Sequence, residues 1–176
     1  RNIAQRFNHQ VGKEYFVLPE VLYSETPKIN STADPTRKMS KSAGDKHYIS
    51  VFESEQRIRK QIRSAVTDTG DTPAGEMSPG VNNLFQLLKA AGQTEAYDHL
   101  RGQYEGGTLK YSELKETVAE ALVGISQVFV EKKKELLTRK KEVKNEIKAA
   151  SADIRKRAQQ TVREVKELTG LANVKF

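Results

Sequence analysis

Asp34-Pro35-Thr36-Arg37-Lys38-Met39-Ser40-Lys41-Ser42 is the most informative stretch of this chain. Lys38 and Lys41 stand three residues apart with a hydroxyl close to each in sequence, and Pro35 restricts the backbone that leads to them. Ammonium and hydroxyl donors on a short loop suit an anion with several oxygens, such as a triphosphate. The alternative is a solvated basic loop, because Lys and Ser are common on protein surfaces. The pattern therefore predicts an anion-binding loop, with the plain surface loop as the competing interpretation.

The five residues Lys38-Met39-Ser40-Lys41-Ser42 resemble, letter for letter, the second signature of the class I aminoacyl-tRNA synthetases. The four residues before them look like the form found in tryptophanyl-tRNA synthetases of the bacterial type. A run of five matching residues arises by chance far less often than a loose Lys-x-x-Lys pattern. Three downstream strings are similar to the same family and fall in its order: Ala65-Val66-Thr67-Asp68-Thr69, Gly80-Val81-Asn82-Asn83-Leu84 and Tyr104-Glu105-Gly106. The resemblance covers essentially the whole chain and corresponds to the C-terminal half of such an enzyme.

The resemblance implies a tryptophan-tRNA ligase, which activates tryptophan with ATP and transfers it to tRNA(Trp). Lys38 and Lys41 would then be the catalytic groups of this chain, because they would pair with the β- and γ-phosphate oxygens of ATP. The residues expected to bind ATP are Ile29, Lys38, Met39, Ser40, Lys41 and Ser42. Ile29 stands where the family places an aliphatic residue against the adenine, although Asn30-Ser31-Thr32 is more polar than the family pattern. ATP is expected as a substrate that carries its own Mg²⁺, and no metal site of the protein is expected.

Two features of the family do not occur in these residues. The first signature, a His-x-Gly-His-like pair, is missing because His9, His47 and His99 are scattered, and the acidic Gly-Glu-Asp-Gln-like string is missing too. We therefore expect a fragment that starts inside a domain at Arg1, with most of the tryptophan pocket and of the dimer surface upstream. The intact enzyme is expected to be a homodimer, and the fragment alone is expected to be inactive.

Composition restricts the class of protein further. The 176 residues, of which 36% are hydrophobic and 30% charged, are enough for one ordinary core, and no apolar run is long enough to span a membrane. The lack of cysteine excludes disulfides and thiolate metal sites and fits a cytoplasmic protein. The net charge of +7 favours a polyanionic partner such as RNA.

The predicted fold is mainly α and has two regions. Residues 1–45 are expected to form the C-terminal end of a Rossmann-like α/β nucleotide-binding domain, which carries the signature loop (residues 38–42). Its expected elements are an opening helix capped by Gly12 and a short strand at Tyr15-Phe16-Val17-Leu18. Residues 46–176 are expected to form an all-α helical domain, which by the resemblance binds the anticodon.

Helical periodicity supports the second region. Ile58, Ile62, Ala65 and Val66 share one face of a helix that Ser54 can cap. Further apolar faces are Val81, Leu84, Leu87 and Leu88; then a short helix near 96–100; then Leu114, Val118, Ala121, Leu122, Ile125, Val128 and Phe129, with Ser112 as the cap; and last Ile154, Ala158, Val162, Val165 and Leu168. The Gly106-Gly107 turn separates the shorter helices from the longer ones.

Two further features are open to two interpretations each. Residues 131–148 hold eight Lys or Arg against four Glu, a net charge of +4, and could contact tRNA phosphates or form a solvated helix surface. Tyr104 and Tyr111 could stack on unpaired bases or pack as half-buried side chains.

Two other functions compete with the ligase. One is a non-catalytic helical RNA-binding or adaptor module that keeps the signature loop as a relic. The other is a relative of the tyrosyl-tRNA synthetases, which the downstream strings disfavour. ATP binding at the loop would separate an enzyme from an adaptor.

Overall fold

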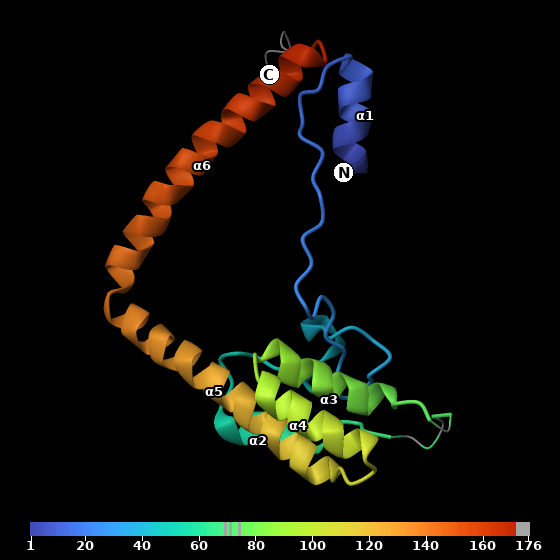
Figure 1. The fold of residues 1–176 in the computed structure, drawn as a ribbon. Helices are drawn as coiled ribbons and strands as arrows, with labels where there is room; N and C mark the ends of the chain where they lie inside the picture. Colours follow the sequence, from blue (N-terminus) through green and yellow to red (C-terminus); the bar gives the residue numbers. More distant parts are fainter. Residues whose placement is uncertain (69, 71, 74, 172–176) are drawn as a thin grey trace. The chain divides into compact units, whose positions relative to one another are not determined.

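The computed structural model describes residues 1–68, 70, 72–73 and 75–171 (Figure 1). Within these ranges the chain is mainly helical, which confirms that part of the predicted fold class. The elements are α1 (Asn2–Val11), η1 (Lys41–Ala43), η2 (Asp45–His47), α2 (Glu55–Arg63), α3 (Pro79–Ala90), α4 (Thr94–Glu105), α5 (Tyr111–Thr138) and α6 (Lys140–Leu168). The described residues contain no β-strand, only an isolated antiparallel bridge between Asn30 and Lys38.

The chain divides into two compact units. The signature unit is Tyr23–Glu135, and the terminal unit combines Arg1–Leu22 with Leu136–Phe176. The signature loop thus lies in the same unit as α2, α3, α4 and most of α5. The predicted domain boundary at residue 45 stays a prediction.

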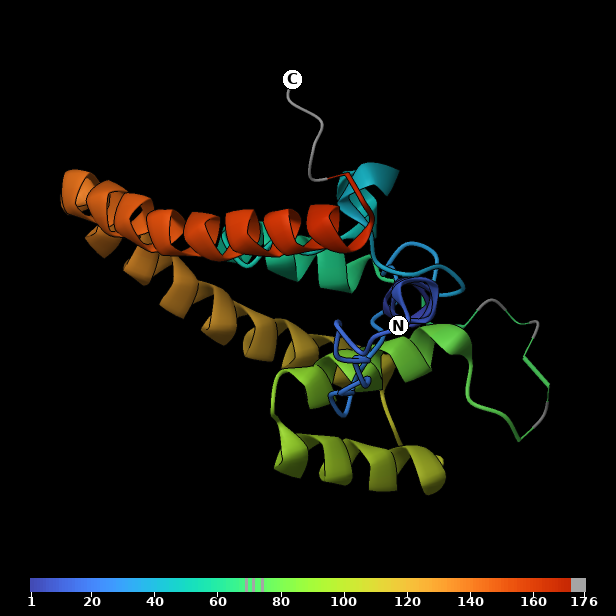
Figure 2. The ribbon, with the colours of Figure 1, turned by 90° about the horizontal axis from the view of Figure 1, so that it is seen from above.

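The core of the signature unit combines one face from each of its four α-helices. Helices α3 and α4 lie side by side, as both ribbon views show (Figure 1 and Figure 2). The buried apolar residues are Ile58, Ile62, Ala65, Val81, Leu84, Phe85, Leu87, Leu88, Leu100, Leu114, Val118, Ala119 and Val123. The face predicted at 81–88 is confirmed, as is the burial of Ile58 and Ile62 on α2, because burying one apolar stripe is what stabilises such helices. Helix α2 ends at Arg63, so Ala65 and the partly buried Val66 lie beyond it and not on its face as predicted.

The long helix α5 follows its predicted face for only part of its length. Leu114 and Val118 are fully buried, whereas Val128 and Phe129 are 67% and 45% exposed. The helix begins at Tyr111, so the predicted cap, Ser112, lies inside it. A period of 3.6 identifies an apolar stripe but does not tell how far along a helix the neighbouring elements reach.

Local sequence explains where α2 and α3 begin. Ser54 and Ser78 are their N-caps, and their side chains accept the backbone N–H groups of Arg57 and Val81. Pro79 follows at the first position of α3, where a missing N–H costs nothing. The Ser54 cap is confirmed.

The start of α3 lies against the backbone that follows α2. A Cβ built on Gly80 would lie 2.2 Å from the carbonyl oxygen of Thr67 and 2.3 Å from that of Val66. The Ser78 hydroxyl donates to the same Thr67 carbonyl at 2.8 Å. Only glycine allows the two backbone segments to come this close.

In the terminal unit, α1 ends at Gly12 as predicted. Gly12 has a φ of 64°, and its backbone N–H bonds to a carbonyl of the last helical turn. The Asn8 side chain accepts the N–H groups of Tyr15 and Phe16 and donates to the Phe16 carbonyl at 2.7 Å. The rings of Phe7, Tyr15 and Phe16 meet at centroid distances of 4.7 to 5.9 Å.

The strand predicted at residues 15–18 is wrong. This segment has no strand geometry, and Val17 is 91% exposed. A strand is stabilised by pairing with a neighbouring strand, and the described part of the chain offers none. The Rossmann-like character of residues 1–45 therefore stays a prediction. The predicted apolar face of the last helix is also largely open, since Ile154 and Val162 on α6 are 67% and 54% exposed.

Candidate functional site

The signature loop is one arm of a narrow hairpin. Asn30 and Lys38 form the antiparallel bridge, and the Met39 N–H donates to the Ile29 carbonyl at 2.9 Å. One step nearer the turn, the Ser31 N–H donates to the Arg37 carbonyl at 2.8 Å. The backbone of residues 29–31 thus sets the position at which Lys38 leaves the hairpin.

Asp34 stabilises the turn of this hairpin. Its carboxylate accepts both the hydroxyl and the backbone N–H of Thr36, at 2.6 and 3.1 Å. The Thr36 hydroxyl, more than any other group, holds the pKa of Asp34 below its usual range. An ionised Asp34 therefore favours the turn.

The charged side chains of the signature loop face solvent. Lys38, Lys41 and Ser42 are exposed, and neither lysine forms an ion pair with any residue that the structure describes. Ser40 and Ser42 hydrogen-bond to each other through their hydroxyls at 2.8 Å. Two unneutralised ammonium groups and two hydroxyls on one short segment are a set of donors that suits a multiply charged anion.

The two apolar candidates point the other way. Met39 and Ile29 are partly buried and pack against the hydrophobic core. Alternation along the arm explains this, because successive residues of an extended segment face opposite sides. Met39 anchors the loop, while its neighbour Lys38 is exposed and Ser40 is partly buried.

Beyond the hairpin the chain turns back on itself. Lys41–Ala43 and Asp45–His47 form two short 3₁₀ helices around Gly44, which has a φ of 108°. The Ser40 N–H donates to the His47 carbonyl at 3.3 Å, and the His47 N–H donates to the Gly44 carbonyl at 2.9 Å. Residues 40–47 therefore form a closed turn whose ends lie together.

Sequence reasoning missed two buried polar residues that support this loop, Ser31 and Asn83. The Ser31 hydroxyl lies 2.9 Å from Nδ1 of His47, and Ser31 is completely buried. The Asn83 side chain, on α3, accepts the Asn30 N–H at 2.9 Å and donates to the Asn30 and Ser31 carbonyls at 3.0 and 3.3 Å. Polar residues at 30–32 looked like a departure from the family pattern, and the structure uses them for hydrogen bonding. The position of Asn83 among apolar residues of an amphipathic helix was the available signal.

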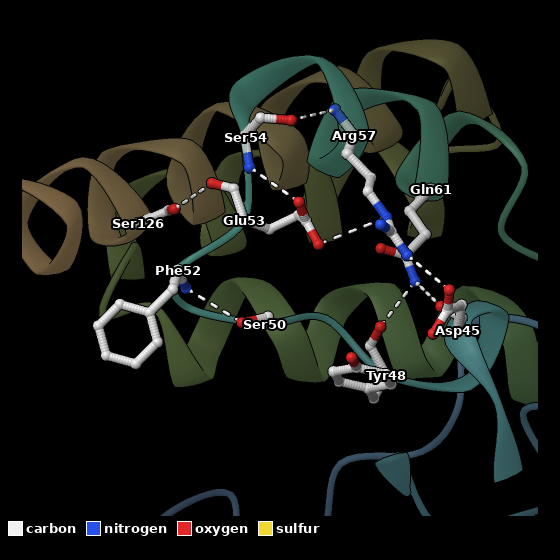
Figure 3. Close-up of polar contacts among 9 residues, drawn as sticks. All are labelled: Asp45, Tyr48, Ser50, Phe52, Glu53, Ser54, Arg57, Gln61 and Ser126. Carbon is white, nitrogen blue, oxygen red and sulfur yellow. Dashed lines mark hydrogen bonds and ion pairs between the residues drawn. The ribbon is translucent and has the colours of Figure 1, made fainter. Parts of the chain in front are cut away.

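A second network holds the segment that follows the loop against α2 (Figure 3). Arg57 pairs with Asp45 at 2.9 Å and with Glu53 at 3.4 Å. The Gln61 side-chain amide donates to the carbonyls of Asp45 and Tyr48 at 2.7 and 2.6 Å. The exit of the signature loop is thereby fixed to the helical core.

The sequence model of the family described as tRNA synthetases class I (W and Y) matches residues 1–127. That is well over half of the chain. The chain belongs to this family.

Relatives and solved structures agree with this membership. The chain is 34% identical over 174 residues to a tryptophan–tRNA ligase of Clostridium perfringens, which covers 97% of the chain and 51% of the relative. It is 36% identical over 179 residues to the tryptophan–tRNA ligase of Enterococcus faecalis, with 97% and 52% covered. The chain thus spans about half the length of these curated relatives, and the predicted resemblance to tryptophanyl-tRNA synthetases is confirmed.

Two crystal structures of tryptophanyl-tRNA synthetases have a fold similar to that of this chain. The tryptophanyl-tRNA synthetase of Mycoplasma pneumoniae superposes with a TM-score of 0.75 at 29% identity, covering 97% of the chain and 51% of that structure. The enzyme of Campylobacter jejuni, in complex with ADP and tryptophan, gives a TM-score of 0.61 at 31% identity, covering 97% and 52%.

The two other candidate RNA contacts differ in their surroundings. Tyr104 packs edge-on against Phe85 with a centroid distance of 6.2 Å, whereas Tyr111 is 37% exposed. In the basic segment, Lys132 pairs with Glu135 at 2.6 Å, and Arg139 lies 3.9 Å from both Glu142 and Glu146. Lys134, Lys140, Lys141, Lys144 and Lys148 form no ion pair with a described residue.

The described residues lack two kinds of feature. No group of three or more His, Cys, Asp or Glu residues in this part of the chain could hold a metal ion. None of its described helices combines the length and the apolar character needed to cross a membrane.

Proposed function

We propose that this chain provides the ATP-phosphate loop and the tRNA-binding helical part of a tryptophan-tRNA ligase. The observation that carries the proposal is the exposed pair Lys38 and Lys41, which has no acidic partner among the described residues and stands on a loop tied down at both ends. Family membership and the names of the relatives support the reaction. The ADP and tryptophan bound to the Campylobacter jejuni relative support the two small substrates.

In the proposed reaction, a carboxylate oxygen of tryptophan attacks the α-phosphorus of ATP. The bond from the α-phosphorus to the bridging oxygen breaks, and pyrophosphate leaves with the electron pair. Negative charge therefore grows on the β- and γ-phosphates in the transition state. Lys38 and Lys41 would stabilise that charge. Such preorganised electrostatic stabilisation is the largest single contribution to the rate enhancement of many enzymes.

The hydroxyls and backbone of the loop would complete phosphate binding. Ser40 and Ser42 now satisfy each other, so an incoming phosphate oxygen could replace that mutual hydrogen bond without leaving a buried donor. Met39 would hold the loop to the core. Ile29 keeps part of its side chain accessible and would contact the adenine. Mg²⁺ would arrive bound to ATP.

The remaining assignments belong to the same proposal. Residues 1–45 would end a Rossmann-like nucleotide-binding domain, and residues 46–176 would form the helical domain that binds the anticodon of tRNA(Trp). The active enzyme would be a longer protein, a homodimer, in which other residues bind and orient tryptophan. A single phosphate loop cannot orient the attacking carboxylate, so we expect no adenylate formation by residues 1–176 alone.

The proposal is tested by tryptophan-dependent pyrophosphate exchange in the longer enzyme. Lys41→Ala should lower the exchange rate a hundredfold or more, since one charged transition-state contact is worth about 3 kcal/mol. Tryptophan binding should change little. Lys60→Ala is the matched control, because Lys60 is an exposed lysine of α2 that likewise has no ion pair with a described residue.

Equal exchange rates for wild type, Lys41→Ala and Lys60→Ala would remove the catalytic role of the loop. If the wild-type enzyme itself shows no exchange but binds RNA, the adaptor module becomes the better description. Exchange that depends on tyrosine and not on tryptophan would instead indicate the tyrosyl relative.

A further inference from the structure

Asn83 lies on α3, far in sequence from the signature loop, and is only 4% exposed. Its side-chain oxygen accepts the Asn30 N–H at 2.9 Å. Its side-chain nitrogen donates to the Asn30 carbonyl at 3.0 Å and to the Ser31 carbonyl at 3.3 Å. One amide group thus satisfies three backbone groups of the first hairpin arm, as a neighbouring strand would.

The arm that Asn83 contacts, residues 29–31, pairs with the opposite arm, which carries Lys38. Asn30 bridges Lys38, and the Ile29 carbonyl accepts the Met39 N–H at 2.9 Å. Only two links therefore separate the Asn83 amide from the backbone of the first signature lysine. A shift of the arm relative to α3 would move the signature loop by a similar amount, because the hairpin backbone is hydrogen-bonded across both arms.

Further hydrogen bonds stiffen the same arm. The Asn30 side chain donates to the Pro35 carbonyl at 2.7 Å, inside the hairpin. The Ser31 hydroxyl contacts His47, whose backbone carbonyl accepts the Ser40 N–H at 3.3 Å. Both ends of the loop therefore depend on residues 30 and 31, and Asn83 joins these residues to the helical core.

The chemistry at this position suits asparagine best. The site needs an acceptor and a donor about two ångström apart on one flat group, which a carboxamide supplies. An aspartate would keep the acceptor but would direct an oxygen at two carbonyl oxygens. An alanine would leave the Asn30 N–H and carbonyl unpaired in a buried setting, which is costly.

We propose that Asn83 is a positioning residue for the signature loop: it transmits the position of α3 to Lys38 and Lys41 and so sets how well the loop holds the ATP phosphates. The proposal rests on the proposed function for its kinetic consequence. Its geometric part, that Asn83 orders the hairpin, holds independently of any activity.

Asn83→Ala and Asn83→Asp should be compared with Asn82→Ala in the longer enzyme. Asn82 is the same residue type on the adjacent position of α3, but it is exposed. In pyrophosphate exchange, both Asn83 variants should lose about tenfold or more in kcat/KM for ATP, since both break the hydrogen bonds that position the loop. The KM for tryptophan should stay within twofold, and Asn82→Ala should match wild type.

Hydrogen exchange followed by mass spectrometry supplies a readout that needs no activity. In the Asn83 variants, peptides that contain Ser31 and Met39 should exchange about tenfold faster or more, whereas peptides from the buried part of α5 should keep their wild-type protection. Asn83→Asp, which keeps the size of the side chain, serves if Asn83→Ala fails to fold.

The proposal is overturned if the hairpin peptides of both Asn83 variants exchange at the wild-type rate. It is also overturned if kcat/KM for ATP and for tryptophan fall together with general loss of protection, since that outcome means a purely structural role. If the wild type shows no exchange activity but the hairpin peptides of the Asn83 variants still lose protection selectively, the proposed function is wrong. The role of Asn83 in ordering the hairpin would then still stand.

Discussion

The buried hydroxyl of Ser126 on α5 donates a hydrogen bond of 2.8 Å to the backbone carbonyl of Glu53. Glu53 directly precedes Ser54, the N-cap of α2, so this bond joins the middle of the longest helix of the signature unit to the start of another (Figure 3). Ser126 is 3% exposed and lines a hollow of about 540 Å³ together with Phe52 and Lys134. The bond fixes the end of the segment that follows the signature loop.

Ser126→Ala should lower the free energy of unfolding by about 1–2 kcal/mol, because the Glu53 carbonyl would lose its partner. Chemical denaturation of the chain measures this. Ser112→Ala on the same helix is the control and should change stability by less than about 0.5 kcal/mol, since Ser112 is exposed. Similar losses for both variants would contradict the role given to the Ser126 hydroxyl.

Gly80→Ala should destabilise the signature unit by about 3 kcal/mol or more, because the new methyl group meets backbone oxygens that cannot move aside. Gly124→Ala should do the opposite. Gly124 lies within α5 and has no neighbouring atom within 4 Å of the point that a Cβ would occupy, so alanine should stabilise the helix by about 0.5–1 kcal/mol. Thermal unfolding of both variants checks the pair, and a neutral Gly80→Ala would mean that α3 starts farther from Thr67.

The Tyr15 phenol donates to the Glu164 carboxylate at 2.5 Å, within the terminal unit. The hydrogen bond raises the pKa of Tyr15 and lowers the pKa of Glu164. Because the carboxyl pKa is lower in the folded state, ionised Glu164 stabilises that state at pH values above the unfolded pKa of about 4.3. This stabilisation is lost as pH falls through the pKa of the folded state. Because the phenol pKa is higher in the folded state, protonated Tyr15 stabilises that state below about pH 10. This stabilisation is lost as pH rises through the pKa of the folded state.

The hydrogen bond between Tyr15 and Glu164 should therefore stabilise the folded state between these two pH limits and should not stabilise it outside them. Glu164→Gln should move the pKa of Tyr15 back toward that of a free tyrosine, as measured by NMR titration of labelled tyrosine carbons. Glu167→Gln, at an exposed position of the same helix, should leave the titration of Tyr15 unchanged. A Tyr15 curve that Glu164→Gln does not alter would show that the contact is absent in solution.

Replacing Lys140, Lys141 and Lys144 by Gln should weaken tRNA binding and flatten its salt dependence. Each lost phosphate contact should reduce the slope of log K against log salt by about 0.7–0.9. The control replaces Arg155, Lys156 and Arg157 by Gln, the same loss of charge on the same helix but outside the basic segment. Filter binding at several salt concentrations decides, and equal effects of the two sets would favour a solvated surface over a defined phosphate contact.

Part of the candidate site could be predicted because its signal is local. The five signature residues identify the loop, Ser54 and Gly12 mark helix ends, and Ile58, Ile62 and Leu84 define core faces by spacing. Each of these depends on a few neighbouring residues and on the preference of one backbone conformation. The strand expected at residues 15–18 failed for the complementary reason, since a strand exists only through its partner.

The sequence by itself determined the family and the helical character, and it predicted Lys38 and Lys41 as the anion-binding groups. Only the tertiary structure decided what holds these lysines in place: the amide of Asn83 beneath Asn30, the buried Ser31 against His47, and the Met39 side chain in the core. A hydrogen bond between residues 30 and 83 leaves no periodic pattern in the sequence. It becomes visible only when folding brings α3 against the hairpin, because burial then makes an unpaired backbone N–H or carbonyl group costly.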